Sequence, residues 1–286
     1  MSLSSTITIG GHVSAAGGPS NAPGRASVFS FNTFQIFSKN QMQWKSKPLP
    51  EEEIKRFADE VKSHSMRNTM VHASYLLNLG TSDPSLKEKA LNGMKVELER
   101  IELLGMDLLT FHPGSSKGIT EKESLKNIAE ALNQVLFKEQ KSKILLETAA
   151  GQGSNVGYNF EQLAEIIDQI SLKDKVGICF DTCHVWASGY DIKSPEGYAE
   201  TMDSFDSTLG LDRLNGFHLN DSKKGTGSRV DRHEQIGQGT LGMDGISNFV
   251  NDRRFRNVPM ILETPRGEEG YDEDLKVIRG VFQEER

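Results

Sequence analysis

The strongest constraint on the fold is an alternation of strand-like and helix-like segments along the whole chain. β-branched and aromatic residues gather in eight short segments bounded by turn-forming residues, namely Ile7–Ser14, Phe31–Ser38, Asn68–Ser74, Asp107–Gly114, Lys143–Ala150, Val176–His184, Asn215–Asp221 and Val258–Pro265. Helical patterns lie between and after them, at Pro50–His64, Ser85–Leu104, Glu121–Gln140, Phe160–Ile170, Ser194–Leu209, Met243–Val250 and Asp272–Phe282. The first connection, Asn21–Val28, has the weakest helical pattern.

This alternation predicts an α/β fold, a single (β/α)8 TIM barrel. Helices of this length between strands favour crossover units and a parallel sheet, and eight strands are the number that closes a barrel. No linker-like stretch or block of charge interrupts the pattern, so we expect residues 1–286 to form one domain. A doubly wound open sheet is the structural alternative.

Composition excludes several classes of protein. The chain is 36% hydrophobic and 26% charged, and no apolar run approaches the roughly 18 residues that a membrane helix needs. The amino terminus lacks the basic and apolar regions of a secretion signal. Its two cysteines, Cys179 and Cys183, are expected to be reduced core residues. We therefore expect a cytoplasmic protein that has no membrane partner and works as a monomer.

Metal-binding residue types stand at the ends of six consecutive predicted strands, where a barrel carries its chemistry. Because side chains alternate along a strand, each of them shares a face with the residue two positions earlier, as His72 does with Met70. In the loop after the seventh strand, Asp231 and His233 project to one side of an extended chain. The nine candidate metal ligands are His72, His112, Glu147, Asp181, His184, His218, Asp231, His233 and Glu263.

Nine ligands are too many for one ion. A catalytic zinc ion takes about three protein ligands and keeps an open position, so nine ligands with one bridging carboxylate suit a cluster of three ions. Ligation by nitrogen and oxygen alone suits zinc, with manganese as a substitute. Five of the seven histidines of the chain belong to this set. We expect His12 to lie beside the site and His64 to lie in a polar helix away from it.

Longer motifs surround these candidates: Gly11–Gly18, Phe111–Ser115, Glu147–Gly153, Asp181–His184, and His218–Asp221 followed by Gly227–His233. They resemble the endonuclease IV family of apurinic/apyrimidinic (AP) endonucleases, and the resemblance spans nearly the whole chain. It implies a zinc-dependent hydrolase that cleaves the phosphodiester 5′ to an abasic site in double-stranded DNA. The products would be a 3′-hydroxyl and a 5′-deoxyribose phosphate, and blocked 3′ ends would also be cleaned.

The same resemblance implies how the ligands divide among three ions. The first ion would be held by His72, His112 and Glu147, the second by Glu147, Asp181, His218 and Glu263, and the third by His184, Asp231 and His233. Glu147 would therefore bridge two ions. Glu263 would lie closest to general-base chemistry, so these two glutamates are the expected catalytic residues.

The net charge of −7 argues against a polyanionic partner, but three divalent ions would offset all but one of these charges. Basic side chains in the expected mouth loops are candidates for phosphate contacts. The resemblance implies that Tyr75 and Leu76 wedge into kinked DNA, and Met42 stands where some family members have an arginine. The candidate DNA contacts are Gln41, Met42, Tyr75, Leu76, Lys223, Arg229 and Arg232. Further basic residues of these loops that could contact phosphate are Lys39, Lys45, Lys47, Lys117 and Lys224.

Two other functions are compatible with parts of this pattern. A sugar isomerase or epimerase on the related xylose isomerase-like barrel also binds divalent metals at its strand ends. It needs only one or two ions, so the trio His184, Asp231 and His233 argues against it. A non-catalytic lesion-binding protein is the second alternative, and it would not require an intact ligand set.

Overall fold

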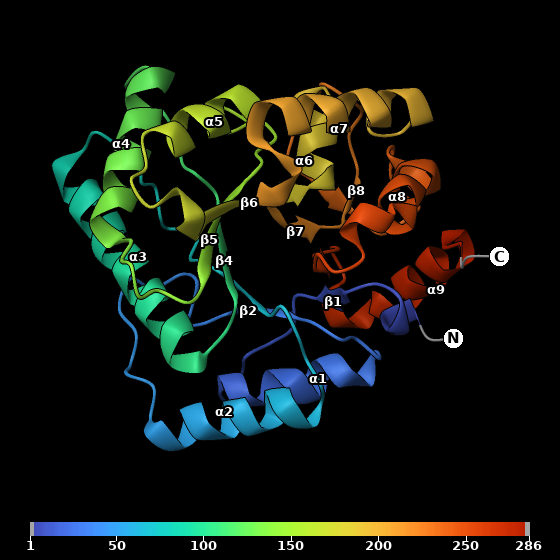
Figure 1. Ribbon diagram of the computed structural model, residues 1–286, viewed down its shortest axis with the longest axis horizontal. Helices are drawn as coiled ribbons and strands as arrows, with labels where there is room; N and C mark the ends of the chain where they lie inside the picture. The colour runs from blue at the N-terminus through green and yellow to red at the C-terminus, as the bar shows by residue number, and fades with distance from the viewer. Residues whose placement is uncertain (1–2, 284–286) are drawn as a thin grey trace.

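The computed structural model describes residues 3–283 of the chain, and within them eight strands form one parallel sheet. The strands are short, and helices surround them on all sides (Figure 1). In chain order the strands of the sheet are β1 Ile9–Gly11, β2 Gln35–Phe37, β3 Met70–His72, β4 Leu108–Phe111, β5 Lys143–Glu147, β6 Val176–Asp181, β7 Leu214–His218 and β10 Met260–Leu262.

The order of the strands confirms the barrel. Neighbours follow one another as β1-β10-β7-β6-β5-β4-β3-β2, and every pairing is parallel. A parallel bridge between His12 and Gln35 joins the two ends of this row, which closes the sheet on itself. A doubly wound sheet would reverse its order at one point, and this sheet does not.

The starts and ends of the helices have local causes in the sequence. The helices are α1 Ala22–Val28, α2 Glu51–Ser63, α3 Pro84–Leu104, α4 Glu121–Val135, α5 Phe160–Asp168, α6 Thr182–Ser188, α7 Pro195–Leu209, α8 Gly242–Asn251 and α9 Tyr271–Val281. Asp83 caps α3 by accepting a hydrogen bond from the Leu86 N–H, and Gly105 ends it with a φ of 66°. A capping box of Thr120 and Glu123 starts α4.

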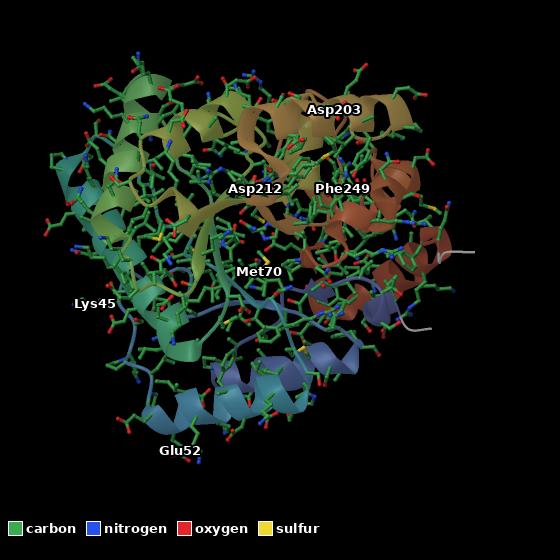
Figure 2. The ribbon with its side chains drawn as sticks, viewed as in Figure 1. Lys45, Glu52, Met70, Asp203, Asp212 and Phe249 are labelled. Atoms are coloured by element: carbon green, nitrogen blue, oxygen red, sulfur yellow. The ribbon has the colours of Figure 1, made fainter. Side chains whose placement is uncertain are left out.

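The interior of the barrel is filled by apolar side chains. One cluster consists of Met70, Leu108, Leu145, Cys179 and Ile261, and Met70 lies at the centre of the molecule in Figure 2. Gly216 makes room for this packing, because an added Cβ would lie 3.1 Å from the terminal carbon of Met70. A larger apolar cluster separates the sheet from the helices. Cys179 and Cys183 are buried and free, as we expected.

Two local elements differ from the expectation. The sixth strand ends at Asp181 rather than at His184, because the Asp181 carboxylate accepts a hydrogen bond from the His184 N–H and starts helix α6. After β7 the chain forms a short hairpin, β8 Asp221–Ser222 with β9 His233–Glu234, where we expected an irregular loop. Both elements turn candidate ligands toward the mouth of the barrel.

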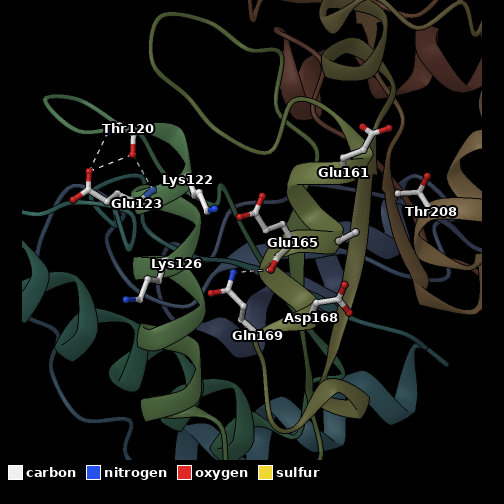
Figure 3. A pocket seen from close by; sticks show the side chains of 10 residues that line it. Thr120, Lys122, Glu123, Lys126, Glu161, Glu165, Asp168, Gln169 and Thr208 are labelled. Carbon is white, nitrogen blue, oxygen red and sulfur yellow. Dashed lines mark hydrogen bonds between the residues drawn. The ribbon is translucent and has the colours of Figure 1, made fainter.

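The outer surface carries a groove of about 740 Å³ between α4 and α5. Charged side chains line most of it, including Lys122 and Lys126 of α4 and Glu161 and Glu165 of α5 (Figure 3). No strand end contributes to this groove, so it is separate from the mouth of the barrel. Within residues 3–283, no helix is both long enough and apolar enough to cross a membrane.

Candidate metal centre

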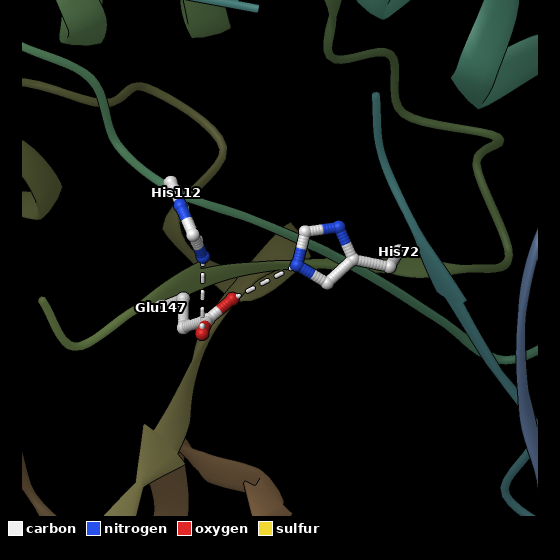
Figure 4. Close-up of side chains that lie close together, drawn as sticks. All are labelled: His72, His112 and Glu147. Atoms are coloured by element: carbon white, nitrogen blue, oxygen red, sulfur yellow. Dashed lines mark ion pairs between the residues drawn. The ribbon is translucent and has the colours of Figure 1, made fainter. Parts of the chain in front are cut away.

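The first group of candidate ligands comes from three neighbouring strands (Figure 4). His72 and Glu147 are the last residues of β3 and β5, and His112 directly follows β4. The Nε2 atom of His72 lies 3.3 Å from Oε2 of Glu147, and Nε2 of His112 lies 3.3 Å from Oε1. One donor atom from each residue lies within 4.8 Å of the other two. These distances bring the three together as a set that can hold one ion.

A second group meets the first at Glu147. Nδ1 of His218 lies 3.1 Å from Oε1 of Glu147 and 3.2 Å from Oε2 of Glu263. It also lies 3.7 Å from Oδ2 of Asp181. The donor atoms of Asp181, His218 and Glu263 satisfy the same 4.8 Å criterion. Glu147 therefore faces both groups, in the position that a bridging carboxylate requires.

The third group depends on the two elements that differ from the expectation. Helix α6 places Nε2 of His184 at 3.1 Å from Oδ1 of Asp231, and the start of β9 places Nε2 of His233 at 3.6 Å from the same oxygen. The Asp231 N–H donates to Oε1 of Gln152, which ties this loop to the segment after β5. All nine predicted ligands thus lie at the same mouth. Sγ of Cys183 also lies within 4.8 Å of donor atoms of Asp181 and His233.

Hydrogen bonds set which nitrogen three of the histidines present to the site. Nδ1 of His72 lies 2.7 Å from the carbonyl oxygen of Ala73, and Nδ1 of His184 lies 2.8 Å from that of Thr148. Nδ1 of His233 lies 3.1 Å from the carbonyl oxygen of Glu263. A carbonyl only accepts, so each Nδ1 carries a proton, and Nε2 is the nitrogen that offers a lone pair when the ring is neutral.

The unpaired atoms of the site test whether divalent ions fit. Among the described residues, the buried atoms without a hydrogen-bond partner include Nε2 of His72, His184 and His233 and Oε2 of Glu147. Leaving such atoms buried and unpaired costs free energy. Lone pairs on neutral imidazole nitrogen and carboxylate oxygen are the donors that zinc takes. The donor set therefore fits divalent ions of this type.

Charge inside the mouth is balanced in the metal-free chain by protons on histidine. Burial would raise the pKa of Glu147, but His112 and His218 lower it well below its usual value. Burial would lower the pKa of His184, but Asp181 and Asp231 raise it well above its usual value. Glu147 thus remains ionised, and His184 holds positive charge close to the carboxylates. Divalent ions can take the place of those protons.

The candidate DNA contacts surround this centre unequally. Met42 is 67% exposed and Tyr75 55% exposed, while Gln41 and Leu76 are half-buried. The Tyr75 ring packs 5.1 Å from the ring of His72, measured between centroids. Lys223, Arg229 and Arg232 are exposed along the segment between β8 and β9. This segment and the loops after β2 and β3 thus present both apolar and basic side chains to solvent.

The expectation for Lys39 is wrong. Its side chain is only 4% exposed, and its Nζ lies 3.1 Å from Oε1 of Glu97, a buried residue of α3. Glu97 also accepts hydrogen bonds from the Ser38 hydroxyl and from the Ser74 N–H. Lys39 therefore belongs to a buried network that joins the loops after β2 and β3, and it does not face a phosphate. Arg229, in contrast, lies 4.9 Å above the ring of Tyr158 and remains exposed.

Two buried amides touch the ligands and were missed from the sequence. Nδ2 of Asn220 donates to Oδ2 of Asp181, and Oδ1 of Asn220 accepts from the Glu263 N–H. Gln35 makes hydrogen bonds with His218 and Glu263. A polar residue inside an apolar strand, such as Gln35 between Phe34 and Ile36, is the signal that could have revealed it. His12 lies beside the site, with Nδ1 3.1 Å from Oε1 of Glu263.

Comparison with known proteins places the chain in a family. Residues 25–281 match the family described as xylose isomerase-like TIM barrel. The chain is 48% identical to a probable endonuclease 4 of Thermoplasma volcanium, over 97% of this chain and 96% of the relative. It is 44% identical to a probable endonuclease 4 of Campylobacter concisus, over 96% and 98% of the two chains.

Solved structures agree with these relatives. The crystal structure of endonuclease IV from Thermus thermophilus superimposes with a TM-score of 0.85 and 34% identity, covering 96% of this chain and 98% of that one. A D-tagatose 3-epimerase-like protein shares the fold at a TM-score of 0.72, with 16% identity. With its barrel, its nine clustered candidate ligands and these relatives, the chain belongs to the endonuclease IV family.

Proposed function

We propose that the chain is a DNA-repair AP endonuclease that uses three zinc ions, with manganese as a substitute. It hydrolyses the phosphodiester 5′ to an abasic site in double-stranded DNA and leaves a 3′-hydroxyl and a 5′-deoxyribose phosphate. The same phosphodiesterase chemistry removes blocking groups from 3′ ends. The observation that carries this proposal is the set of three ligand groups around Glu147, with four buried donor atoms that lack any other partner.

The nine residues divide as three sets. His72, His112 and Glu147 would hold one ion, Glu147, Asp181, His218 and Glu263 a second, and His184, Asp231 and His233 a third. Bound zinc supplies an acidified water at neutral pH and positive charge against the phosphate oxygens. The side chains of this mouth cannot supply that positive charge themselves. Asp and Glu are anionic, and each histidine must lose its proton to become a ligand.

Glu263 is the residue of this chain that we assign to proton handling. Burial would raise its pKa, but the neighbouring His218 and His12 lower it, so the carboxylate is ionised and can accept a hydrogen bond from a water molecule. Its side chain is 13% exposed, which keeps it within reach of a water and a phosphate at the mouth. Glu147 is fully buried at the junction of two groups, so its role is to hold them together.

The loops of the mouth account for recognition of damaged duplex DNA. Exposed Met42 and Tyr75, with half-buried Leu76, can fill the stack that a missing base leaves open. Lys223, Arg229 and Arg232 extend from one side of the mouth and can neutralise phosphates. Gln41 is held close to the loop of Tyr75 and Leu76 because its carbonyl accepts a hydrogen bond from the Ser74 hydroxyl. The apolar side chains and the basic side chains therefore border the same candidate metal centre.

Incubation of the purified protein with a duplex that carries one abasic site tests the activity directly. Cleavage 5′ to the site, with 3′-hydroxyl and 5′-deoxyribose phosphate ends, is the expected result. Binding without cleavage would instead support a lesion-binding protein. Conversion of ketose or aldose sugars without DNA cleavage would support the epimerase alternative, for which the structures at 16% identity show only a shared fold.

Metal analysis tests the cofactor separately. We expect about three zinc ions per chain, since each catalytic ion takes about three protein ligands. Brief exposure to EDTA should leave much of the activity, because protein side chains surround the ions on several sides. One ion per chain in a fully active sample, or immediate loss of activity with complete rescue by Mg²⁺, would contradict the cluster.

We also propose that the chain works as one domain, as a monomer, in the cytoplasm. All nine ligands come from the strand ends and loops of a single barrel, so a second subunit is not needed to complete the centre. Both cysteines are free and buried, which suits a reducing compartment. Sedimentation of the zinc-loaded protein tests the oligomeric state.

A further inference from the structure

Gln35 occupies an unusual place for an amide. It is the first residue of β2, its side chain is 0% exposed, and it lies where β2 meets β1 to close the barrel. From there the side chain reaches residues of two other strands far along the chain, His218 at the end of β7 and Glu263 just after β10. Both of these are candidate ligands of the second ion.

The direction of these hydrogen bonds follows from chemistry. A carboxylate oxygen that binds a metal can only accept a hydrogen bond, so the atom of Gln35 at 2.6 Å from Oε1 of Glu263 is the donor Nε2. The amide oxygen of Gln35 then faces Nε2 of His218 at 2.9 Å and can only accept. Nε2 of His218 must therefore carry a proton. Amide orientation and imidazole tautomer are thus set together.

The consequence is that each ligand presents one defined atom to the ion. When His218 is neutral, as a metal ligand must be, a proton on Nε2 leaves the lone pair on Nδ1, the atom that faces Glu147 at 3.1 Å and Oε2 of Glu263 at 3.2 Å. Oε1 of Glu263 is occupied by Gln35 and by His12, whose Nδ1 lies 3.1 Å away. Oε2 of Glu263 is left for the metal.

His218 differs in this respect from His72, His184 and His233. Backbone carbonyls accept from Nδ1 of those three, so they present Nε2, whatever side chains surround them. His218 presents Nδ1 and depends on the side chain of Gln35. A single substitution of Gln35, which is not itself a candidate ligand, would therefore release the His218 ring from this orientation.

We propose that Gln35 is a positioning residue of the second ion, which holds the proton on Nε2 of His218 and one oxygen of Glu263 so that Nδ1 and Oε2 are free to bind. This rests on the proposed three-ion function. Partners that orient metal ligands typically contribute about 10- to 100-fold to metal affinity or activity. Loss of Gln35 should therefore lower the affinity for the second ion and leave the binding of the other two unchanged.

The first test compares Gln35→Met with Gln140→Met and the unaltered protein, all loaded with zinc. Methionine has nearly the shape of glutamine but lacks the amide. Gln140 is an equally buried amide that donates to the Ser142 carbonyl away from the mouth. Zinc transfer to excess chelator is followed with a colorimetric indicator. We expect one ion of Gln35→Met to leave about 10- to 100-fold faster, and Gln140→Met to match the unaltered protein.

Equal release from the two variants would overturn the inference. If the unaltered protein bound no zinc, the proposed function would fail instead, so the two failures are distinguishable. A second measurement needs no variant: ¹⁵N NMR of the imidazole rings in the zinc-loaded protein. His218 should bind through Nδ1 and retain an Nε2 proton, whereas His72, His184 and His233 should bind through Nε2. A His218 that binds through Nε2 would also overturn the inference.

Discussion

Two layers of the barrel interior are built from the same strands but differ in chemistry. The lower layer holds apolar side chains, Met70, Leu108, Leu145, Cys179 and Ile261. The upper layer begins two residues further along several of these strands and holds the candidate ligands, as Glu147 follows Leu145 on β5. The lower layer and most of the upper layer are buried, yet only the lower one stabilises the fold without partners. Buried polar atoms of the upper layer cost free energy until something pairs with them.

The same strands thus serve folding through the lower layer and metal binding through the upper layer. Burial of an apolar side chain stabilises the barrel by about 1.5–3 kcal/mol, independently of any ligand. An unpaired buried donor or acceptor costs about 1–3 kcal/mol. Substitutions in the lower layer should therefore change folding, whereas substitutions in the upper layer should change metal binding and chemistry.

The largest expected effect is in the upper layer. Glu263→Gln should lower the rate of incision by several orders of magnitude, because the variant cannot accept a proton and loses one charge of the second ion site. Its melting temperature should change little. Steady-state incision of an abasic duplex and thermal unfolding measure the two quantities.

His64→Ala is the matched control for this variant, because His64 lies at the end of α2 and pairs with Glu60 on the outer surface. It should leave the incision rate unchanged. A comparable loss of activity in His64→Ala would mean that the mouth is not where the chemistry occurs.

Leu145→Ala tests the lower layer. Leu145 is fully buried in the barrel interior, and its truncation should reduce the free energy of unfolding by about 2–5 kcal/mol. Zinc content per folded chain should not change. Urea unfolding and elemental analysis of the folded fraction check both statements. Leu103→Ala, at a residue 46% exposed on α3, should cost less than about 0.5 kcal/mol. If Leu145→Ala also lost zinc, the layers would not be separable.

The next variant tests the loop after β3, which lies above both layers. Truncation of Tyr75 and Leu76 to alanine should weaken binding of an internal abasic duplex by a few kcal/mol, the usual scale of unstacking a base step. Zinc content should stay the same. The loss should be smaller for a blocked 3′ end at a frayed nick, where less stacking is broken. Binding and incision rates on both substrates provide the measurement.

Tyr75 also packs against the His72 ring, so the melting temperature must be recorded with these rates. Phe137→Ala serves as the control, since Phe137 is an exposed apolar residue in a groove between α3 and α4. Equal losses on both DNA substrates, together with a lower melting temperature, would show that the two residues only pack the loop.

The smallest effect concerns pH. The raised pKa of His184 stabilises the zinc-free fold below about 6.5, and this contribution is lost as the pH rises through the higher folded value. The lowered pKa of Glu147 stabilises the same fold above about pH 4.5, and this contribution is lost as the pH falls through the lower folded value. The zinc-free protein should therefore melt highest between these values.

Under the proposed function, bound zinc would replace the protons on the candidate ligand histidines, so the zinc-loaded protein should not lose melting temperature between pH 6.5 and 8.5. Thermal unfolding of both forms across this range measures the difference. A zinc-free protein whose melting temperature rises steadily over the same range would contradict the assigned direction of the histidine shifts.

The repeat of strands and helices was enough to predict the barrel and the place of its ligands. Side chains alternate strictly along a strand, so the positions of Met70 and His72, or of Leu145 and Glu147, follow from counting residues. Where regular structure ended, counting failed. His184 reaches the mouth through one turn of α6 rather than along β6, and His233 reaches it through a hairpin.

Charge and hydrogen-bond roles were the least predictable. Lys39 looked like a phosphate contact, but α3 supplies Glu97 to bury it. Gln35 carried no assigned role, because its partner His218 lies 183 residues away in the sequence. A side chain whose partners come from distant strands has no local pattern that identifies them.

The sequence by itself determined the barrel, its nine candidate ligand residues and the end of the barrel where they lie, because these follow from periodicity and chain order. Tertiary structure alone decided which nitrogen each histidine presents, which basic side chains reach solvent, and that Glu147 stands between two ligand groups. The reason is physical: a proton or a buried charge is placed by whichever atoms lie within about 3 Å, and folding alone brings those atoms together.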